Sequence, residues 1–346
     1  HVLTSPKLGL SMSENWERGL SIQHGCKYFM YLGDDDALIG HCIVRAMRHL
    51  DCSDIPIYSW FRWPYYWPDA EFGSGSNVLY IPLGEAVTSV KSLDMLKAYY
   101  SGASGFEHMP TFYNSIILSR WYDHTIRPLY GDKFFKRALA PDVYSGAVLA
   151  AYSTQYAFSY NSCSLSGISK QSNGMRQSKR STLVADFYDK SKDSWSSFGL
   201  ETRPESMAVA ISCDLFNARN AYFPERDIKL DYEDVISRAT NELIRADVAI
   251  IARLREIVFL SRLWNVNLRP EFVQHLKCRV MSDMAGDSHS TPSYVVSQEK
   301  RPVCSRKNNV MIVNCDPVGV SDVFQASLLF EIGIKLASSD QVLSAK

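Results

Sequence analysis

Three consecutive acidic residues carry the most distinctive chemistry in the sequence. Asp34, Asp35 and Asp36 directly follow residues 27–32, an apolar and aromatic run that predicts a buried strand. Their charges repel one another, and Mg²⁺ or Mn²⁺ would relieve that repulsion because hard cations prefer oxygen ligands. Successive side chains diverge, so one or two of the three can reach one metal, and water and a diphosphate would complete its coordination. The alternative is a helix N-terminus, with Asp36 as the N-cap of a helix over 37–50.

Histidines and aromatic residues give weaker signals. His108 and His124 are expected to be structural rather than metal ligands. A stretch rich in aromatic residues and proline, 60–67, is predicted to be a loop whose rings either stack on the apolar faces of sugars or form a small hydrophobic cluster. The aromatic residues concerned are Trp60, Trp63, Tyr65, Tyr66 and Trp67.

Composition excludes several classes of protein. The 346 residues include 37 Lys and Arg against 37 Asp and Glu, so the chain lacks a basic field for phosphates, and no nucleic-acid partner is expected. The longest apolar run, 248–260, contains Arg253, Arg255 and Glu256, which makes it unsuitable as a membrane span. The eight cysteines show no zinc-like spacing, which predicts reduced cysteines in a reducing compartment.

The order of predicted elements indicates an α/β domain followed by a mainly helical region. Ser11 and Glu14 form a capping box ahead of a helix that ends at Gly25. Further strands are predicted at 55–61, 78–81, 114–118 and 312–320, and further helices at 89–100, near Trp121, and at 142–152, 182–192, 232–245, 248–263, 270–284 and 323–336. Polar stretches at 159–181 and 286–309 are predicted to be loops. A parallel sheet binds ligands outside the carboxyl ends of its strands, which is where the aspartates lie.

The surroundings of the aspartates resemble the metal-motif region of the family-2 glycosyltransferases, in which an N-x-x-x-G helix leads through G-x-Y into a strand that ends in D-x-D. The matching residues are Asn15, Trp16, Glu17, Gly19, Leu20, Gly25, Tyr28, Leu32, Gly33 and Asp34 to Asp36. Two subfamily-level similarities follow: 140–145 resembles a P-D-V segment, and 167–174 resembles the polar loop after it. Together the similarities cover about positions 8 to 175.

The resemblance implies a GT-A fold, a Rossmann-like mixed sheet flanked by helices that binds a nucleotide-sugar donor. It assigns Asp34 and Asp36 to the D-x-D positions that hold the donor diphosphate through Mn²⁺ or Mg²⁺, with Asp36 preferred as the direct metal ligand. Asp35 would face the ribose of the donor or shape the loop. The predicted domains are a partial GT-A domain over 1–180 and a mainly helical region over 181–346.

The resemblance also implies a catalytic base. Members of the family invert the anomeric centre in one displacement, which needs a carboxylate to remove the proton of the acceptor hydroxyl. Asp142 is the candidate because Pro141 and the start of a helix would fix its orientation, and ordinary helix capping is the alternative. Asp132 and Glu107 are lesser candidates for the same role.

The polar loop over 166–174 is the remaining candidate element. It could close over the diphosphate through backbone N–H groups and hydroxyls, with Ser169 among them and Lys170 as the counter-charge. The alternative is an ordinary serine-rich surface loop.

The N-terminus departs from the family pattern. In the family, a strand–helix–strand portion that binds the nucleotide base precedes D-x-D. Only 33 residues precede Asp34 here, too few for that unit in addition to the helix and strand already assigned. The sequence therefore predicts a partial domain that binds its donor poorly and leaves a sheet edge uncovered.

The predicted function is that of an inverting, metal-dependent, hexosyltransferase-like enzyme. It would move a sugar from a nucleotide-diphosphate donor to a glycan or another hydroxyl acceptor, as in polysaccharide biosynthesis. Two alternatives stay open: a non-catalytic interaction protein that keeps the fold without donor binding, and a two-metal nucleotidyl or phosphoryl transferase, which needs a second inward acid. The expected location is the cytoplasm, with peripheral association at the inner face of the membrane as an option.

Overall fold

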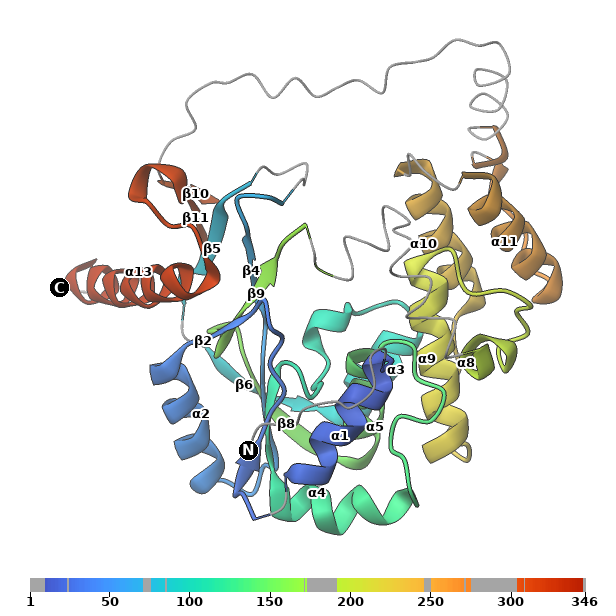
Figure 1. Cartoon of the computed structure of the whole chain (residues 1–346), viewed down its shortest axis with the longest axis horizontal. Coiled ribbons are helices and arrows are strands. Elements are labelled where there is room, and N and C mark those ends of the chain that lie inside the picture. Colours follow the sequence, from blue (N-terminus) through green and yellow to red (C-terminus); the bar gives the residue numbers. More distant parts are fainter. Residues whose placement is uncertain are drawn as a thin grey trace.

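The chain folds as a mixed α/β protein, which confirms the predicted class. The computed structural model describes residues 10–344 except 24, 71–75, 85, 171, 173–191, 246–249, 271, 275–303 and 308. Two sheets with both parallel and antiparallel pairings form the centre, and helices surround them (Figure 1). Residues 182–191 of the helix predicted over 182–192 and most of the helix predicted over 270–284 lie outside the described residues, as do residues 286–303 of the loop predicted over 286–309.

Sheet A positions the candidate site. Its strands are ordered β1 (Tyr28–Phe29), β7 (Ser115–Leu118), β3 (Ile57–Trp60), β8 (Gln155–Ser159) and β6 (Val87–Lys91). β7 is antiparallel to both β1 and β3, and β3 is parallel to β8. Therefore β1, β3 and β8 run in the same direction and end at the same edge of the sheet.

Helices cover both faces of sheet A (Figure 1). On one face, the Tyr58 ring packs in a core with α2 (Gly40–Asp51). On the other, the neighbouring Ile57 packs in a core with α1 (Met12–Ile22), α3 (Ser92–Tyr100) and α5 (Pro141–Tyr152). This alternation is the period of two that a strand buried on both faces requires. The short α4 (Ser119–Thr125) follows β7, as predicted near Trp121.

Sheet B joins the two ends of the chain. Its order is β10 (Cys304–Lys307), β11 (Val310–Asn314), β5 (Val78–Pro82), β4 (Trp63–Tyr66), β9 (Ser164–Ile168) and β2 (Ala37–Leu38). β11 pairs antiparallel with β5, and α13 (Val323–Ser344) packs on the same strand. The late strands therefore return to the sheet that the first half of the chain builds.

The helical region consists of α8 (Lys192–Ser196), α9 (Met207–Tyr222), α10 (Tyr232–Arg245) and α11 (Ile250–Leu263). α10 and α11 confirm the predicted helices at 232–245 and 248–263. α9 was not predicted, although it packs on both α5 and α10 and so connects the helical region to sheet A. Short 3-10 helices complete the described elements at Phe106–His108, Arg127–Leu129 and Asp316–Val318.

Helix capping follows the sequence at α1 but not at α2. Ser11 and Glu14 form the predicted capping box, in which the Glu14 carboxylate accepts from the Ser11 N–H at 2.7 Å. The prediction that Asp36 caps the next helix is wrong. α2 begins at Gly40, and its N-cap residue, Ile39, makes no side-chain cap bond, because Ala37 and Leu38 pair with β9 instead.

Three predicted loops contain strands. The stretch over 60–67 includes β4, the one over 286–309 includes β10, and the serine-rich stretch over 159–181 includes β9. β9 is buried because its small side chains find internal partners: the Trp60 indole N–H donates to the Ser164 hydroxyl at 3.0 Å. Serine therefore serves here as a small, hydrogen-bonded core residue rather than as a surface residue.

In the described part of the chain, no helix is both long enough and apolar enough to cross a membrane.

Two carboxylates hold the N-terminus of α9. The Glu256 carboxylate accepts from the N–H groups of Glu205 and Ser206 at 2.8 and 3.0 Å, and Glu242 accepts from the N–H groups of Met207 and Ala208 at 2.8 Å. The pKa of Glu256 is raised to about 8, chiefly by burial and in smaller part by the nearby charges of Glu205 and Glu242, while the two N–H groups oppose the shift.

Stability is expected to decline with pH because of Glu256. Its folded pKa is raised above the ordinary value of 4.5, so the stability that its proton contributes is fully present below pH 4.5 and is lost as the pH rises to about 8. The loss is on the order of 5 kcal/mol. Urea unfolding at several pH values should show this decline in the natural protein and a flatter profile in Glu256→Gln. Glu201→Gln, a change at an exposed acid, should keep the natural slope; equal slopes in all three proteins would contradict the prediction.

Candidate functional site

The candidate site lies at the edge of sheet A where three strands end. The aspartates follow β1, and Arg62 follows β3. The last turn of α5 leads into the start of β8. The first turn of α5, which carries Asp142, therefore lies at the edge of sheet A where β8 ends, together with the aspartates and Arg62. This is the position at which open α/β sheets bind ligands.

The Asp36 carboxylate is the centre of the site. Its side chain is only 3% exposed. Oδ1 accepts from the Gly167 N–H at 2.9 Å, and Oδ2 accepts from the Gly33 N–H at 3.3 Å. Arg62 places Nη1 3.7 Å from the same Oδ2. Asp36 therefore joins the turn after β1 to β9 and to the loop between β3 and β4.

Arg62 is held by an aromatic ring as well as by charge. Its Cζ lies 3.9 Å from the centroid of the Tyr113 ring, which is the geometry of a cation–π contact. Burial raises the pKa of Tyr113, and the charge of Asp36 raises it further while Arg62 opposes the shift. Gly33, which directly precedes the aspartates, leaves room for the Tyr113 ring, because a Cβ at this position would lie 2.0 Å from the Tyr113 hydroxyl.

Asp35 connects the aspartate turn to the polar segment after β9. Its Oδ2 accepts from the Ser172 hydroxyl at 2.6 Å, and the Ser172 Oγ accepts from the Ser169 N–H at 2.9 Å. Burial raises the pKa of Asp35, as do the charges of Asp36 and Asp34, while the Ser172 bond lowers it. Gly167 lets β9 approach the Asp35 backbone closely, because a Cβ at residue 167 would lie 1.7 Å from the Asp35 carbonyl oxygen.

Asp34 and Lys170 occupy more open positions. Asp34 is exposed, and in the described part of the chain no residue forms a hydrogen bond or ion pair with its side chain. Lys170 is also exposed, and its backbone N–H lies 3.4 Å from the Asp69 carboxylate. Of the predicted ligands, the structure thus brings Ser169 and the three aspartates together and leaves Asp34 as the open carboxylate.

Asp142 stands at the second residue of α5, after Pro141 as predicted. Its Oδ1 accepts from the Val143 N–H at 2.9 Å, so the side chain does contribute to the helix start. Burial raises the pKa of Asp142, and the charge of Arg62 and the Val143 N–H oppose the shift. Arg62 therefore acts electrostatically on both Asp36 and Asp142.

Asp214, on α9, fixes the segment that leads into α5. This carboxylate is fully buried and accepts from the N–H groups of Leu139 and Ala140 at 2.6 and 2.7 Å. Burial raises the pKa of Asp214, the two N–H groups oppose the shift, and the charge of Asp142 adds to it. The helical region thus positions the helix that carries the predicted base.

The other predicted residues lie apart from Asp36 or in the core. Asp132 is 80% exposed, lies 3.7 Å from the Lys136 ammonium, and lines a separate cavity beside α1. Glu107 is about half exposed and lies 3.8 Å from the His108 ring. Trp60 and Tyr65 are fully buried, so these two rings belong to a hydrophobic cluster. Trp63, Tyr66 and Trp67 are half-buried.

Asp34 and Asp36 are the carboxylates that could ligate a divalent cation here, and at Oδ2 of Asp36 the cation would compete with Arg62. Asp34 offers an exposed carboxylate, and Asp36 offers Oδ2 beside the charge of Arg62. Among the described residues, no three His, Cys, Asp or Glu side chains converge to hold a metal by themselves. A cation here would take its other ligands from a diphosphate and from water, as Mg²⁺ commonly does.

Comparison of the chain with protein-family models and with curated proteins gave no match. The resemblance to family-2 glycosyltransferases therefore remains a prediction, and the geometry of the site has to support any function.

Arg62, Tyr113 and Asp214 were not predicted as site residues. Arg62 is the one basic residue within the aromatic stretch over 60–67, and Asp214 is the one acid within the sequence of α9. A single charge in such surroundings is a usable signal, because it must be paired or hydrogen-bonded when the stretch is buried. Tyr113 gave no comparable signal.

Proposed function

We propose that this chain forms the catalytic core of an inverting, metal-dependent glycosyltransferase with a GT-A fold, acting on a nucleotide-sugar donor and a glycan or other hydroxyl acceptor. The observation that carries the proposal is the position of Arg62, which lies 3.7 Å from Asp36 and whose charge also acts on Asp142. Arg62 thus links the aspartates that we propose to bind the donor with the residue that we propose as the base.

Each residue has a role in this proposal. Asp34 and Asp36 would hold Mn²⁺ or Mg²⁺, which when bound neutralises charge on the leaving diphosphate. Asp142 removes the proton of the acceptor hydroxyl, and burial favours this role because it moves the pKa of the carboxyl towards the working pH. The charge of Arg62 opposes that upward shift of the pKa and so favours the ionised carboxylate that accepts a proton.

The buried aspartates give the site its rigidity. Asp36 fixes the turn that presents Asp34, and Asp35 with Ser172 fixes the segment that presents Ser169 and Lys170. Asp214 fixes the start of α5. A site that is held before the substrate arrives needs little reorganisation during the reaction.

Metal-dependent donor binding tests the proposal. The full-length gene product should bind a nucleoside diphosphate much more tightly with Mn²⁺ than with EDTA in calorimetric titrations. Asp34→Asn should lose about tenfold in affinity with Mn²⁺, because it removes the open carboxylate. Asp54→Asn, a change at an exposed aspartate outside the site, should behave like the natural protein.

The alternatives predict different outcomes of the same titration. Equal binding with Mn²⁺ and EDTA would contradict the proposal and favour a non-catalytic interaction protein. Two cations bound per chain would favour the two-metal transferase.

A further inference from the structure

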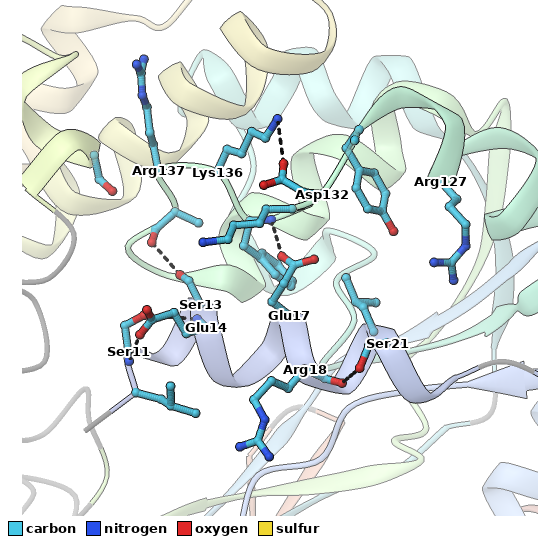
Figure 2. Close-up of a pocket in the computed structure, with 18 residues that line it drawn as sticks. Ser11, Ser13, Glu14, Glu17, Arg18, Ser21, Arg127, Asp132, Lys136 and Arg137 are labelled. Atoms are coloured by element: carbon cyan, nitrogen blue, oxygen red, sulfur yellow. Dashed lines mark hydrogen bonds and ion pairs between the residues drawn. The ribbon is translucent and has the colours of Figure 1, made fainter. Parts of the chain in front are cut away.

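A cavity lies away from the aspartates, between α1 and the segment from Arg127 to Ala138 (Figure 2). Its volume is about 770 Å³, within the range of small-molecule sites. The lining contains none of Asp34, Asp36, Arg62 or Asp142. The cavity is therefore not explained by the proposed donor site.

Basic residues outnumber acidic residues in the lining of this cavity. The basic residues are Arg18, Arg127, Lys133, Lys136 and Arg137, and the acidic residues are Glu14, Glu17 and Asp132. The acids are already engaged within the protein. Glu14 belongs to the capping box of α1, the Glu17 carboxylate accepts from the N–H groups of Phe134 and Phe135 at 3.0 Å, and Asp132 faces Lys136 (Figure 2).

Two hydrogen-bond donors in the lining have no protein partner in the described part of the chain. The Ser194 side chain is buried, with the residue 1% exposed, and its Oγ makes no hydrogen bond. The Arg127 Nη2 is also buried and unpartnered, although Nε of the same side chain donates to Asp123 at 2.8 Å. Buried donors are normally satisfied, so water or a ligand in the cavity would supply the acceptor that each of them lacks.

The two unpartnered donors lie towards opposite ends of the cavity. Ser194 is tied to Arg137, because the Asn217 amide donates to the carbonyl oxygens of both residues. Figure 2 shows Arg137 near the Ser13 end of α1 and Arg127 near the Ser21 end. Eight residues of helix separate Ser13 from Ser21, which is a distance of about 12 Å.

We propose that this cavity binds an elongated anion that carries several phosphate or carboxylate groups, one end accepting from Ser194 and the other from Arg127. The excess of basic side chains, which include Lys133, favours negative charge along the ligand. An inorganic phosphate chain and an acidic oligosaccharide share this chemistry, and the experiment separates them. The proposal does not depend on the glycosyltransferase activity.

Calorimetric titrations at low salt in EDTA test the proposal, because EDTA removes metal-dependent binding at the aspartates. The probes are inorganic tripolyphosphate and a trimer of galacturonic acid. Binding of the first alone identifies a phosphate chain, and binding of the second alone or of both identifies a site that accepts an acidic glycan. Failure of both probes to bind would overturn the proposal.

Variants locate the binding. Lys133→Glu and Ser194→Ala should each weaken the binding of the active probe, by about tenfold for the charge reversal, with unchanged melting temperatures. Lys229→Glu is the matched control, because Lys229 is exposed and does not line the cavity. Equal weakening by Lys133→Glu and Lys229→Glu would mean that the probe responds to net charge alone, and would overturn the assigned site.

Discussion

Replacing Arg62 with methionine is expected to lower the free energy of unfolding by about 3 kcal/mol, because the change leaves the buried Asp36 carboxylate without its counter-charge. Arg62 is itself 21% exposed, so solvent screens this pair only in part. The double variant Arg62→Met/Asp36→Asn should recover most of the loss, because asparagine removes the charge and keeps an oxygen for the Gly167 N–H. Urea unfolding of the single and double variants measures both effects.

Arg48→Met is the matched control for this change, because Arg48 is exposed on α2. Its effect should stay within about 0.5 kcal/mol. A similar loss in both single variants would mean that Arg62 stabilises the protein through its aliphatic stem rather than through its charge on Asp36. Arg62→Met should also bind Mn²⁺ more tightly than the natural protein if Asp36 is a metal ligand, because Arg62 and a cation compete for Oδ2 of Asp36.

Asp142→Asn is expected to slow sugar transfer by about 10²–10⁴-fold, because it removes the group that takes the acceptor proton. Donor affinity should stay nearly unchanged, since the base contacts the acceptor rather than the donor. Asparagine also keeps an oxygen for the Val143 N–H, so the start of α5 should be preserved. The measurement is the rate of nucleoside diphosphate release from a nucleotide-sugar, with the full-length gene product, Mn²⁺ and either water or a glycan as acceptor.

Asp132→Asn is the matched control for the base, because Asp132 is exposed and lines the separate cavity beside α1. It should retain the natural rate. If Asp142→Asn retains more than about a tenth of the activity, the base has to be sought elsewhere, first at Glu107 and then at Asp132.

The sequence predicted most elements that carry a local signal. The capping box at Ser11 and Glu14, the strand at 78–81 and the amphipathic helix at 232–245 were all recognised because their patterns are periodic or because their cap chemistry is specific. α9 was missed because it is buried on nearly all sides, so its sequence has no polar face from which a helical period could be read.

The serine-rich stretch shows why the candidate site could be predicted only in part. Polarity indicated a loop, but Ser164 and Gly167 lie in a buried strand whose small side chains let the Asp35 backbone and the Trp60 ring approach. That role depends on partners more than a hundred residues away in the sequence. The grouping of Asp36 with Arg62 depends likewise on the pairing of strands and could not be deduced from spacing.

The three aspartates differ in exposure, and the sequence did not predict that difference. The sequence favoured Asp36 as the direct metal ligand, whereas the structure buries Asp36 among the N–H groups of Gly33 and Gly167 and leaves Asp34 open. A buried carboxylate that accepts two backbone N–H groups is first of all an organiser of the turn.

The most direct test of the proposed site is a crystal structure of the full-length gene product with Mn²⁺ and a nucleoside diphosphate, in which anomalous scattering locates the metal. The proposed glycosyltransferase site predicts Mn²⁺ about 2.1 Å from a carboxylate oxygen of Asp34 or Asp36. The diphosphate should lie on the Asp142 side of that metal, near Ser169. A metal bound elsewhere, or a diphosphate found only in the cavity beside α1, would contradict the proposed site.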